Sequence, residues 1–293
     1  MQNINDWRKA GQIAAEALKF GRALIVKGAS YLEVTEKIEA KIKELGGDCA
    51  FPPQMSLNDV AAHFTVDPEE DIAFDDHVVS LDIGVHVNGA IGDTACTVDL
   101  SGKYSEMVKA SEEALKAAVE KVKIGVKLGE IGRVIDETIR RFGFVPIRNL
   151  SGHGLGLYDI HSAPTIPNYD TKTSEVLEKG QIIAIEPFAT NGAGLIYETE
   201  RANIFSQIES RPVRSMATRQ MLKEIEKYKG LPFTTRWLAK KFPLFKVNFA
   251  LRELQNAGML RAYPPLHDKS HGIVTQAEHT VLVDEKVEVL TRV

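Results

Sequence analysis

Five side chains with the chemistry of metal ligands lie in short segments that have the pattern of strands or turns. They are four carboxylates and one imidazole: Asp82, Asp93, His153, Glu186 and Glu278. Carboxylates rarely occupy apolar strands unless a cation or an ion pair offsets the cost of their desolvation. Because no Lys or Arg alternates with these residues, the pattern favours a bound cation.

The first two carboxylates fall in a segment that predicts a β-hairpin over residues 78–100, with Asn88-Gly89 as its two-residue turn. This turn places Asp82 opposite residue 95, two positions from Asp93 and on the same face of the sheet. Two carboxylates that close repel each other unless metal ions lie between them. A bulge near Gly92 would shift this register, and capping a turn is the alternative role for either Asp taken alone.

The other three candidates occupy different local patterns. His153 lies between glycines in residues 151–156, which predicts a loop that exposes a ring nitrogen. The alternatives are an ordinary solvated histidine or a phosphate-binding loop, and the second is weak because no lysine follows. Glu186 ends an apolar strand before a proline, and Glu278 precedes the apolar residues 281–283. An inward carboxylate at either position would be buried without a donor.

Four carboxylates and one imidazole suit two divalent ions that share bridging carboxylates. Manganese, iron(II), cobalt and zinc all accept this ligand set, and the affinity order does not choose among them. A pair of such ions can activate water and polarise a carbonyl group, which is hydrolytic chemistry.

The composition is that of a globular protein. With 293 residues, 44% hydrophobic and 26% charged, the chain can bury a large core as one domain or two unequal ones. A net charge of −4 gives no general attraction to nucleic acid or to anionic membranes. The two cysteines form no Cys-x-x-Cys pair, and neither a signal peptide nor an 18-residue apolar run is present. We therefore expect a cytoplasmic protein without a membrane or DNA partner.

An internal repeat predicts that two halves of the chain build the site between them. Residues 28–46 match residues 125–143 without a gap, and each copy reads as an amphipathic helix closed by a glycine. Each copy follows another helical segment, over 6–27 and 105–123. A chance match of two generic helices is the alternative. Strand patterns over 181–186, 194–197 and 280–283 complete an α+β arrangement in which helices flank an antiparallel sheet.

The ligand segments resemble, in order, the five ligand motifs of the methionine aminopeptidases. They read Leu81-Asp82-Ile-Gly, Asp93-Thr-Ala, Ser151-Gly-His153, Ile185-Glu186-Pro-Phe-Ala-Thr and Gln276-Ala-Glu278-His-Thr. The resemblance covers essentially the whole chain. It implies the pseudo-twofold pita-bread fold, which agrees with the repeat. It also implies removal of the N-terminal initiator methionine from nascent proteins when the second residue is small.

The resemblance assigns a role to each ligand. Asp82 would chelate one of two divalent ions, Asp93 and Glu278 would bridge both, and His153 and Glu186 would complete the other. The resemblance also implies that Glu186 is a catalytic residue.

Further residues match the family's substrate site. His63 would lie near the scissile amide and His161 would contact the substrate carbonyl, so both would be catalytic and substrate-binding residues. Phe51, Ile160 and Phe188 would line the methionine pocket. Without the resemblance, His63 reads as a helix end, His161 as a loop residue and the three apolar residues as core. Ser162 and Pro164 depart from the family pattern beside His161.

The long interval between Glu186 and Glu278 resembles the type II branch of this family, in its archaeal form. An inserted helical subdomain over 209–270, similar to a winged helix, would interrupt a catalytic domain of 1–208 and 271–293. Its expected helices are 215–229, 236–241 and 246–257. Residues 211–271 carry a net charge of +9 within a chain of −4, which suggests weak contact with ribosomal RNA. A solvated helical surface is the alternative.

Three other functions are alternatives to peptide hydrolysis. They are a metal-free binding protein of this fold, a proline-directed dipeptidase or creatine hydrolase, and DNA binding by the insert. The complete set of five ligands favours the peptidase.

Overall fold

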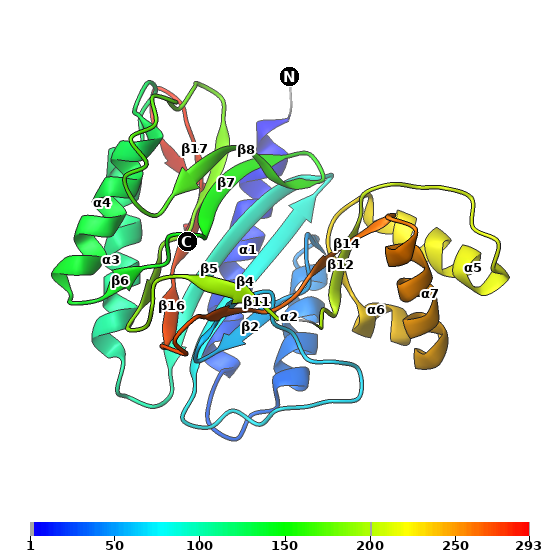
Figure 1. The fold of residues 1–293 in the computed structure, drawn as a ribbon. Coiled ribbons are helices and arrows are strands. Elements are labelled where there is room, and N and C mark those ends of the chain that lie inside the picture. Colours follow the sequence, from blue (N-terminus) through cyan, green and yellow to red (C-terminus); the bar gives the residue numbers. More distant parts are fainter. Residues whose placement is uncertain (1–2, 200, 293) are drawn as a thin grey trace.

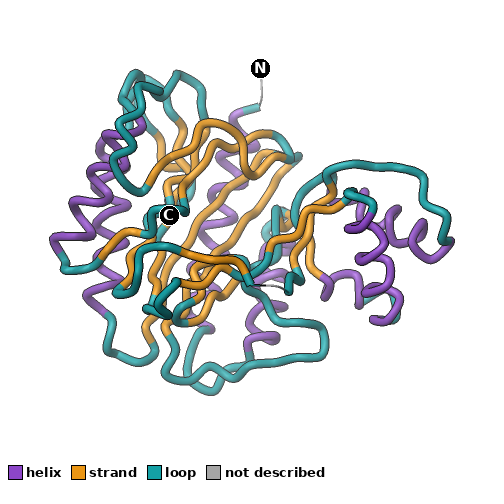
Figure 2. Tube along the Cα trace, in the orientation of Figure 1, coloured by secondary structure: helices purple, strands orange, loops and turns teal. Residues whose placement is uncertain are grey.

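The computed structural model describes residues 3–199 and 201–292, and its centre is a nine-stranded sheet whose paired strands run antiparallel. Seven strands follow the order β1-β4-β5-β17-β9-β7-β8, while β2 pairs with β4 and β18 with β17 (Figures 1 and 2). Their bounds are β1 Asp48–Cys49, β2 Gln54–Leu57, β4 Val78–Val87, β5 Ala90–Asp99, β7 Ser151–Gly156, β8 Asp159–Pro167, β9 Ile182–Ile185, β17 Glu278–Leu282 and β18 Glu288–Val289.

The predicted hairpin is formed by β4 and β5. Its register is continuous, and Asp82 pairs with Ala95 as expected, without the bulge considered near Gly92. Asn88 and Gly89 both have positive φ angles, 54° and 92°. This is the backbone that a type I′ turn requires, so the Asn-Gly turn sets the register of both strands.

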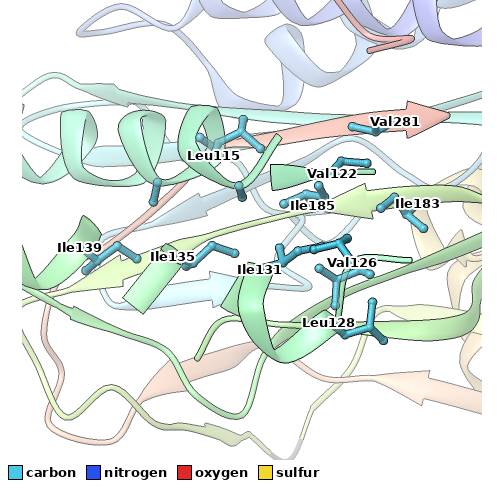
Figure 3. Close-up of a cluster of buried hydrophobic side chains, with 14 of the residues drawn as sticks. Leu115, Val122, Val126, Leu128, Ile131, Ile135, Ile139, Ile183, Ile185 and Val281 are labelled. Carbon is cyan, nitrogen blue, oxygen red and sulfur yellow. The ribbon is translucent and has the colours of Figure 1, made fainter. Parts of the chain in front are cut away.

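Two helix pairs cover the sheet, as the repeat predicts. The first pair is α1 (Ile4–Leu24) and α2 (Tyr31–Glu44), and the second is α3 (Ser105–Lys121) and α4 (Leu128–Arg141). Figure 1 shows α1 behind β4 and β5, with α3 and α4 at one side of the sheet. The apolar face of α4, with Ile131, Ile135 and Ile139, packs in a cluster with Ile183 and Ile185 of β9 (Figure 3). An amphipathic helix becomes stable through this kind of burial.

Equivalent positions of the two repeats make equivalent backbone contacts. The amide of Gly28, before α2, donates to the carbonyl of Phe74 at 2.7 Å. The amide of Gly125, at the same position before α4, donates to the carbonyl of Leu177 at 2.8 Å. The two halves thus repeat tertiary contacts as well as helical periodicity, which gives the pseudo-twofold pita-bread arrangement.

The segment after β12 (Ile204–Gln207) forms a separate group of helices, at the right of Figure 1. It contains α5 (Met216–Ile225), a 3₁₀ turn (Glu226–Tyr228), α6 (Thr235–Ala239) and α7 (Leu244–Asn256). A three-stranded sheet, β13 (Phe233–Thr234), β12 and β14 (Leu260–Tyr263), packs with these helices around a shared apolar cluster. The helix expected over 215–229 is divided: α5 ends at Ile225, the 3₁₀ turn continues to Tyr228, and Lys229 ends that turn in a left-handed conformation.

Two further three-stranded sheets join segments that are distant in the sequence. One contains β6 (Val145–Pro146), β10 (Phe188–Thr190) and β16 (Val274–Gln276), and the other contains β3 (Val60–Ala62), β11 (Ile196–Glu198) and β15 (Leu266–Asp268). The described helices include none that is long and apolar enough to cross a membrane.

Candidate metal centre

The five predicted ligands come from five strands that are consecutive neighbours in the main sheet. In the order β4-β5-β17-β9-β7, these strands carry or immediately precede Asp82, Asp93, Glu278, Glu186 and His153. The Nε2 atom of His153 lies 3.4 Å from Oε1 of Glu186 and 3.9 Å from Oδ2 of Asp93. Ligand atoms of Asp93, His153 and Glu278 all lie within 4.8 Å of one another. The sheet order therefore gathers residues that are up to 196 positions apart.

His153 lies in a strand, and the expectation of an exposed loop was wrong. The neighbouring strands approach so closely that only glycine fits beside it. A Cβ atom on Gly152 would lie 2.3 Å from the carbonyl oxygen of Ala184, and one on Gly154 would lie 2.0 Å from that of Ala163. The glycines thus allow close packing of β7 between β8 and β9, and they form no phosphate-binding loop.

Burial and mutual repulsion oppose ionisation of the four carboxyl groups. Burial raises the pKa of Asp82 to about 7. It also raises the pKa values of Asp93, Glu186 and Glu278 well above their ordinary range, and the charges of neighbouring carboxylates add to the effect. Within the described chain, Oδ1 of Asp82 and Oδ1 of Asp93 are buried without a hydrogen-bond partner. Buried oxygen donors that lack partners, beside an imidazole, fit a divalent cation.

The three histidines around these carboxyl groups are neutral at pH 7. Burial, with a contribution from the nearby His161, lowers the pKa of His153 to about 3 and that of His63 to about 4. Burial also lowers the pKa of His161. A neutral imidazole ligates a metal through one nitrogen or donates a hydrogen bond from the other. Burial therefore keeps these histidines in the neutral form that both roles require.

One cavity of ≈ 210 Å³ is lined by all the residues predicted for the site. Its wall includes the five ligands together with the two further histidines and the three apolar residues, namely His63, His161, Phe51, Ile160 and Phe188. The ring centroids of His153 and His161 are 4.7 Å apart. Ligand side chains and apolar side chains therefore line the same cavity.

The backbone around the two further histidines differs from the simple alternatives considered for them. His63 is not at a helix end: it follows β3 with a φ of 63°, and its amide donates to Oε1 of Gln54 at 2.6 Å. His161 lies within strand β8 and not in a loop. Pairing of β8 with its neighbour fixes the direction of the His161 side chain more firmly than a loop would.

Sequence reasoning missed several residues of the cavity. Tyr263 lies between two histidines, with ring centroids 5.3 Å from His63 and 6.2 Å from His161. Outside the lining residues, Nε2 of Gln276 lies 3.3 Å from Oε2 of Glu278, and its place beside Glu278 in the last motif was the available signal. The other lining residues are Ser151, which begins the motif of His153, and six that carry no recognisable local pattern: Gln54, Ala62, Asn149, Leu150, Ile204 and Pro232.

Comparison with known proteins agrees with this geometry. The profile of metallopeptidase family M24 matches residues 5–285. The chain belongs to metallopeptidase family M24. Membership implies the use of divalent metal, as the buried ligand set also indicates.

Similar M24 proteins match the chain along nearly its full length. The chain is 42% identical to the methionine aminopeptidase of Methanocaldococcus jannaschii, with 97% of both chains covered. It is 46% identical to that of Archaeoglobus fulgidus, with 94% of both covered. The crystal structure of a methionine aminopeptidase from Thermotoga maritima superposes with a TM-score of 0.72 at 25% identity, covering 99% of this chain and 96% of the other.

Proposed function

We propose that this protein is a metal-dependent aminopeptidase that removes an N-terminal methionine when the next residue is small. The observation that carries this proposal is the single cavity in which five ligand side chains face an apolar wall. The similarity to methionine aminopeptidases over nearly the whole chain supports the choice of substrate.

The site would hold two divalent ions, with cobalt, manganese, iron(II) and zinc as the candidates. Asp82 would bind one ion, His153 and Glu186 the other, and Asp93 and Glu278 would bridge them. The central place of β5 and β17 among the five strands supports this assignment, because Asp93 and Glu278 lie between the outer ligands. Bound divalent ions supply activation of water and polarisation of the scissile carbonyl.

The protein side chains would bind and orient the peptide. Phe51, Ile160 and Phe188 form an apolar wall suited to an unbranched thioether side chain. His161, neutral because its pKa is lowered, would donate a hydrogen bond to the carbonyl of the scissile bond, and His63, also neutral, would lie near the scissile amide. Their position between the ligands and Tyr263 supports these roles.

A peptide assay tests the proposal. The purified protein is stripped with a chelator, reloaded separately with each candidate metal and given Met-Ala, Met-Leu, Leu-Ala and X-Pro peptides. We expect metal-dependent release of methionine from Met-Ala, with slower cleavage of Met-Leu and Leu-Ala. Equal cleavage of Met-Ala and Met-Leu would contradict the limit on the second residue. Faster cleavage of Leu-Ala or X-Pro would contradict the choice of substrate.

We further propose that the protein acts on nascent chains in the cytoplasm and that residues 209–270, as a winged-helix-like subdomain, contact the ribosome weakly. Exposed basic residues on the two neighbouring helices α5 and α7 support this contact: Arg219, Lys223, Lys246 and Arg252. Phe245 and Phe249 of α7 are 71% and 60% exposed, and aromatic rings beside cations suit contact with unpaired bases.

Co-sedimentation with ribosomes at increasing salt tests this contact. The test variant carries Arg219→Gln, Lys223→Gln, Lys246→Gln and Arg252→Gln. The control variant carries Lys240→Gln, because Lys240 already pairs with Glu36 at 2.8 Å. We expect binding at low salt that the test variant loses and the control keeps. If binding is unchanged by added salt and by the four substitutions, the basic helices are a solvated surface and do not contact the ribosome through these charges.

A further inference from the structure

A second group of ligand side chains lies outside the M24 cavity. It consists of Asp59 in the turn between β2 and β3, His267 in β15, and His271 in the loop that follows. The Nδ1 atoms of His267 and His271 lie 3.2 Å and 2.7 Å from Oδ2 of Asp59. Their ligand atoms are all within 4.8 Å of one another. Two imidazole nitrogens thus converge on one carboxylate oxygen.

The loop that carries the two histidines is held in place from inside by Asp268. This carboxylate is fully buried, and its Oδ1 atom accepts hydrogen bonds from the amides of Ala193 at 3.0 Å and Ser270 at 2.9 Å. Oδ1 also accepts a bond from the hydroxyl of Ser270 at 3.0 Å, and Oδ2 accepts one from the amide of Gly194 at 3.2 Å. These bonds fix the turn between positions 267 and 271, so the ligand nitrogens are positioned before any ion binds.

The opposite side of the group is fixed as well. The backbone carbonyl of Asp59 accepts a hydrogen bond from the amide of Asp268 at 2.9 Å, and the carbonyl of Asn58 accepts one from Val274 at 2.8 Å. Burial acts to raise the pKa of Asp59, but hydrogen bonds from His271 and His267 hold it below its ordinary value. The backbone bonds thus hold the β2–β3 turn, and Asp59 with it, beside the loop after β15.

We propose that Asp59, His267 and His271 form a second metal site, which binds a divalent ion of the zinc class. Two imidazoles and one carboxylate suit Zn²⁺, Co²⁺, Ni²⁺ or Cu²⁺ better than Mg²⁺ or Ca²⁺, which prefer oxygen ligands. Side chains of His271 and Asp59 are 67% and 24% exposed, so water can complete the coordination. The ion would join the β2–β3 turn to the loop after β15, and β3 leads directly to Ala62 and His63 in the wall of the M24 cavity.

Counting bound zinc tests the site. The full-length protein is stripped with a chelator, dialysed against buffered Zn²⁺ and analysed for ions per chain. The key variant is His271→Lys, which can still pair with Asp59 through its Nζ atom but removes the imidazole ligand. A matched control is His77→Lys, at a histidine that belongs to neither group of ligands and whose Nδ1 accepts a hydrogen bond from the amide of Asp75. His271→Lys and Asp59→Asn should each bind one zinc ion fewer per chain than the wild type and the control.

A second readout separates the metal site from a simple ion pair. Zn²⁺ should raise the Tm of the His77→Lys protein further than that of the His271→Lys protein, because only the former keeps the cross-link. If His271→Lys binds as much zinc as the wild type, the group is an ion pair between Asp59 and histidine and the inference is overturned. The difference in count is independent of how many ions the M24 centre holds, so the proposed peptidase activity is tested separately.

Discussion

The ring of Phe51 fills the space that a side chain at Gly84 would need. A Cβ atom built on Gly84 would lie 2.1 Å from Cε1 of that ring. Gly84 pairs with Asp93 across the β4–β5 hairpin. One backbone position is therefore in contact with Phe51 of the apolar group and next to Asp93 of the ligand group. Packing at residue 84 therefore links the metal ligands to the proposed methionine pocket.

Replacing Gly84 by alanine should impair peptide binding more than metal binding. The new methyl group would push the Phe51 ring out of its place in the cavity wall, because a Cβ atom at position 84 would overlap the ring. We expect Gly84→Ala to raise KM for a Met-Ala peptide while the number of bound ions stays unchanged. The double variant Gly84→Ala/Phe51→Leu, with a smaller side chain at position 51, should recover part of the loss. An unchanged KM in Gly84→Ala would show that this contact has no part in substrate binding.

The proposed roles of Glu278 and His161 predict different losses. Glu278→Ala should abolish both metal loading and turnover, since a bridging carboxylate contacts both ions. His161→Ala should keep the ions but lower kcat by about 10² to 10³ fold, the typical effect of removing one donor to the transition state. Ion counting and steady-state kinetics distinguish the two, with Glu285→Ala on the exposed surface as the control. Loss of metal in His161→Ala, or full activity in Glu278→Ala, would refute the assignment.

The metal-free protein should lose stability as the pH rises through about 7. The folded state holds protons on carboxyl groups with raised pKa values, Asp82 at about 7 and Asp93 well above its ordinary value, whereas the unfolded chain has already released them. Stability then falls by about 1.4 kcal/mol per pH unit for each proton involved. His153 and His63, with lowered pKa values of about 3 and 4, act in the opposite direction only below about 6.5, where the unfolded histidines become charged.

Urea unfolding of the stripped protein between pH 6.5 and 8 measures this dependence. We expect a midpoint that decreases across this range, and a flatter profile for Asp82→Asn, which removes the carboxyl group whose pKa is about 7. A midpoint that increases with pH would mean that the carboxyl groups are already ionised in the folded, metal-free protein.

The glycines that end the two repeated helices should respond alike to substitution. Gly46 and Gly143 both have a φ of 85°, in the left-handed region, and an added Cβ would meet no close neighbour at either position. The expected cost of Gly46→Ala or Gly143→Ala is therefore backbone strain of about 1 to 2 kcal/mol. Chemical denaturation checks this value, and asparagine at the same positions should cost less. A much larger loss at one position would show that the two halves differ in their packing.

Local patterns were sufficient to predict the hairpin and its ligands. The Asn88-Gly89 turn has one preferred geometry, so the register of Asp82 and Asp93 followed from counting residues. The repeat was visible because each half must bury the same helix face. The resemblance to a known family supplied the histidines and the apolar wall, which have no distinctive pattern of their own.

Other features depend on contacts between distant segments and could not be read from local sequence. The run of glycines around His153 resembled a loop, because nothing nearby in the sequence reveals that the strands β8 and β9 press against it. Tyr263 enters the cavity from β14, which contains none of the ligand motifs. Likewise, 208 residues separate Asp59 from His267, which it meets only after β3 pairs with β15.

Ile204, Pro232 and Tyr263 line the M24 cavity, yet they belong to the β12–β14 region that packs with the helical group and its own apolar cluster. The ligands and the rim of the cavity are thus carried by two separately packed parts of the chain. Amino-acid changes in the helical group can reshape the rim without disturbing the metal ligands. Selectivity for the incoming chain can therefore diverge between relatives while their hydrolytic chemistry stays the same.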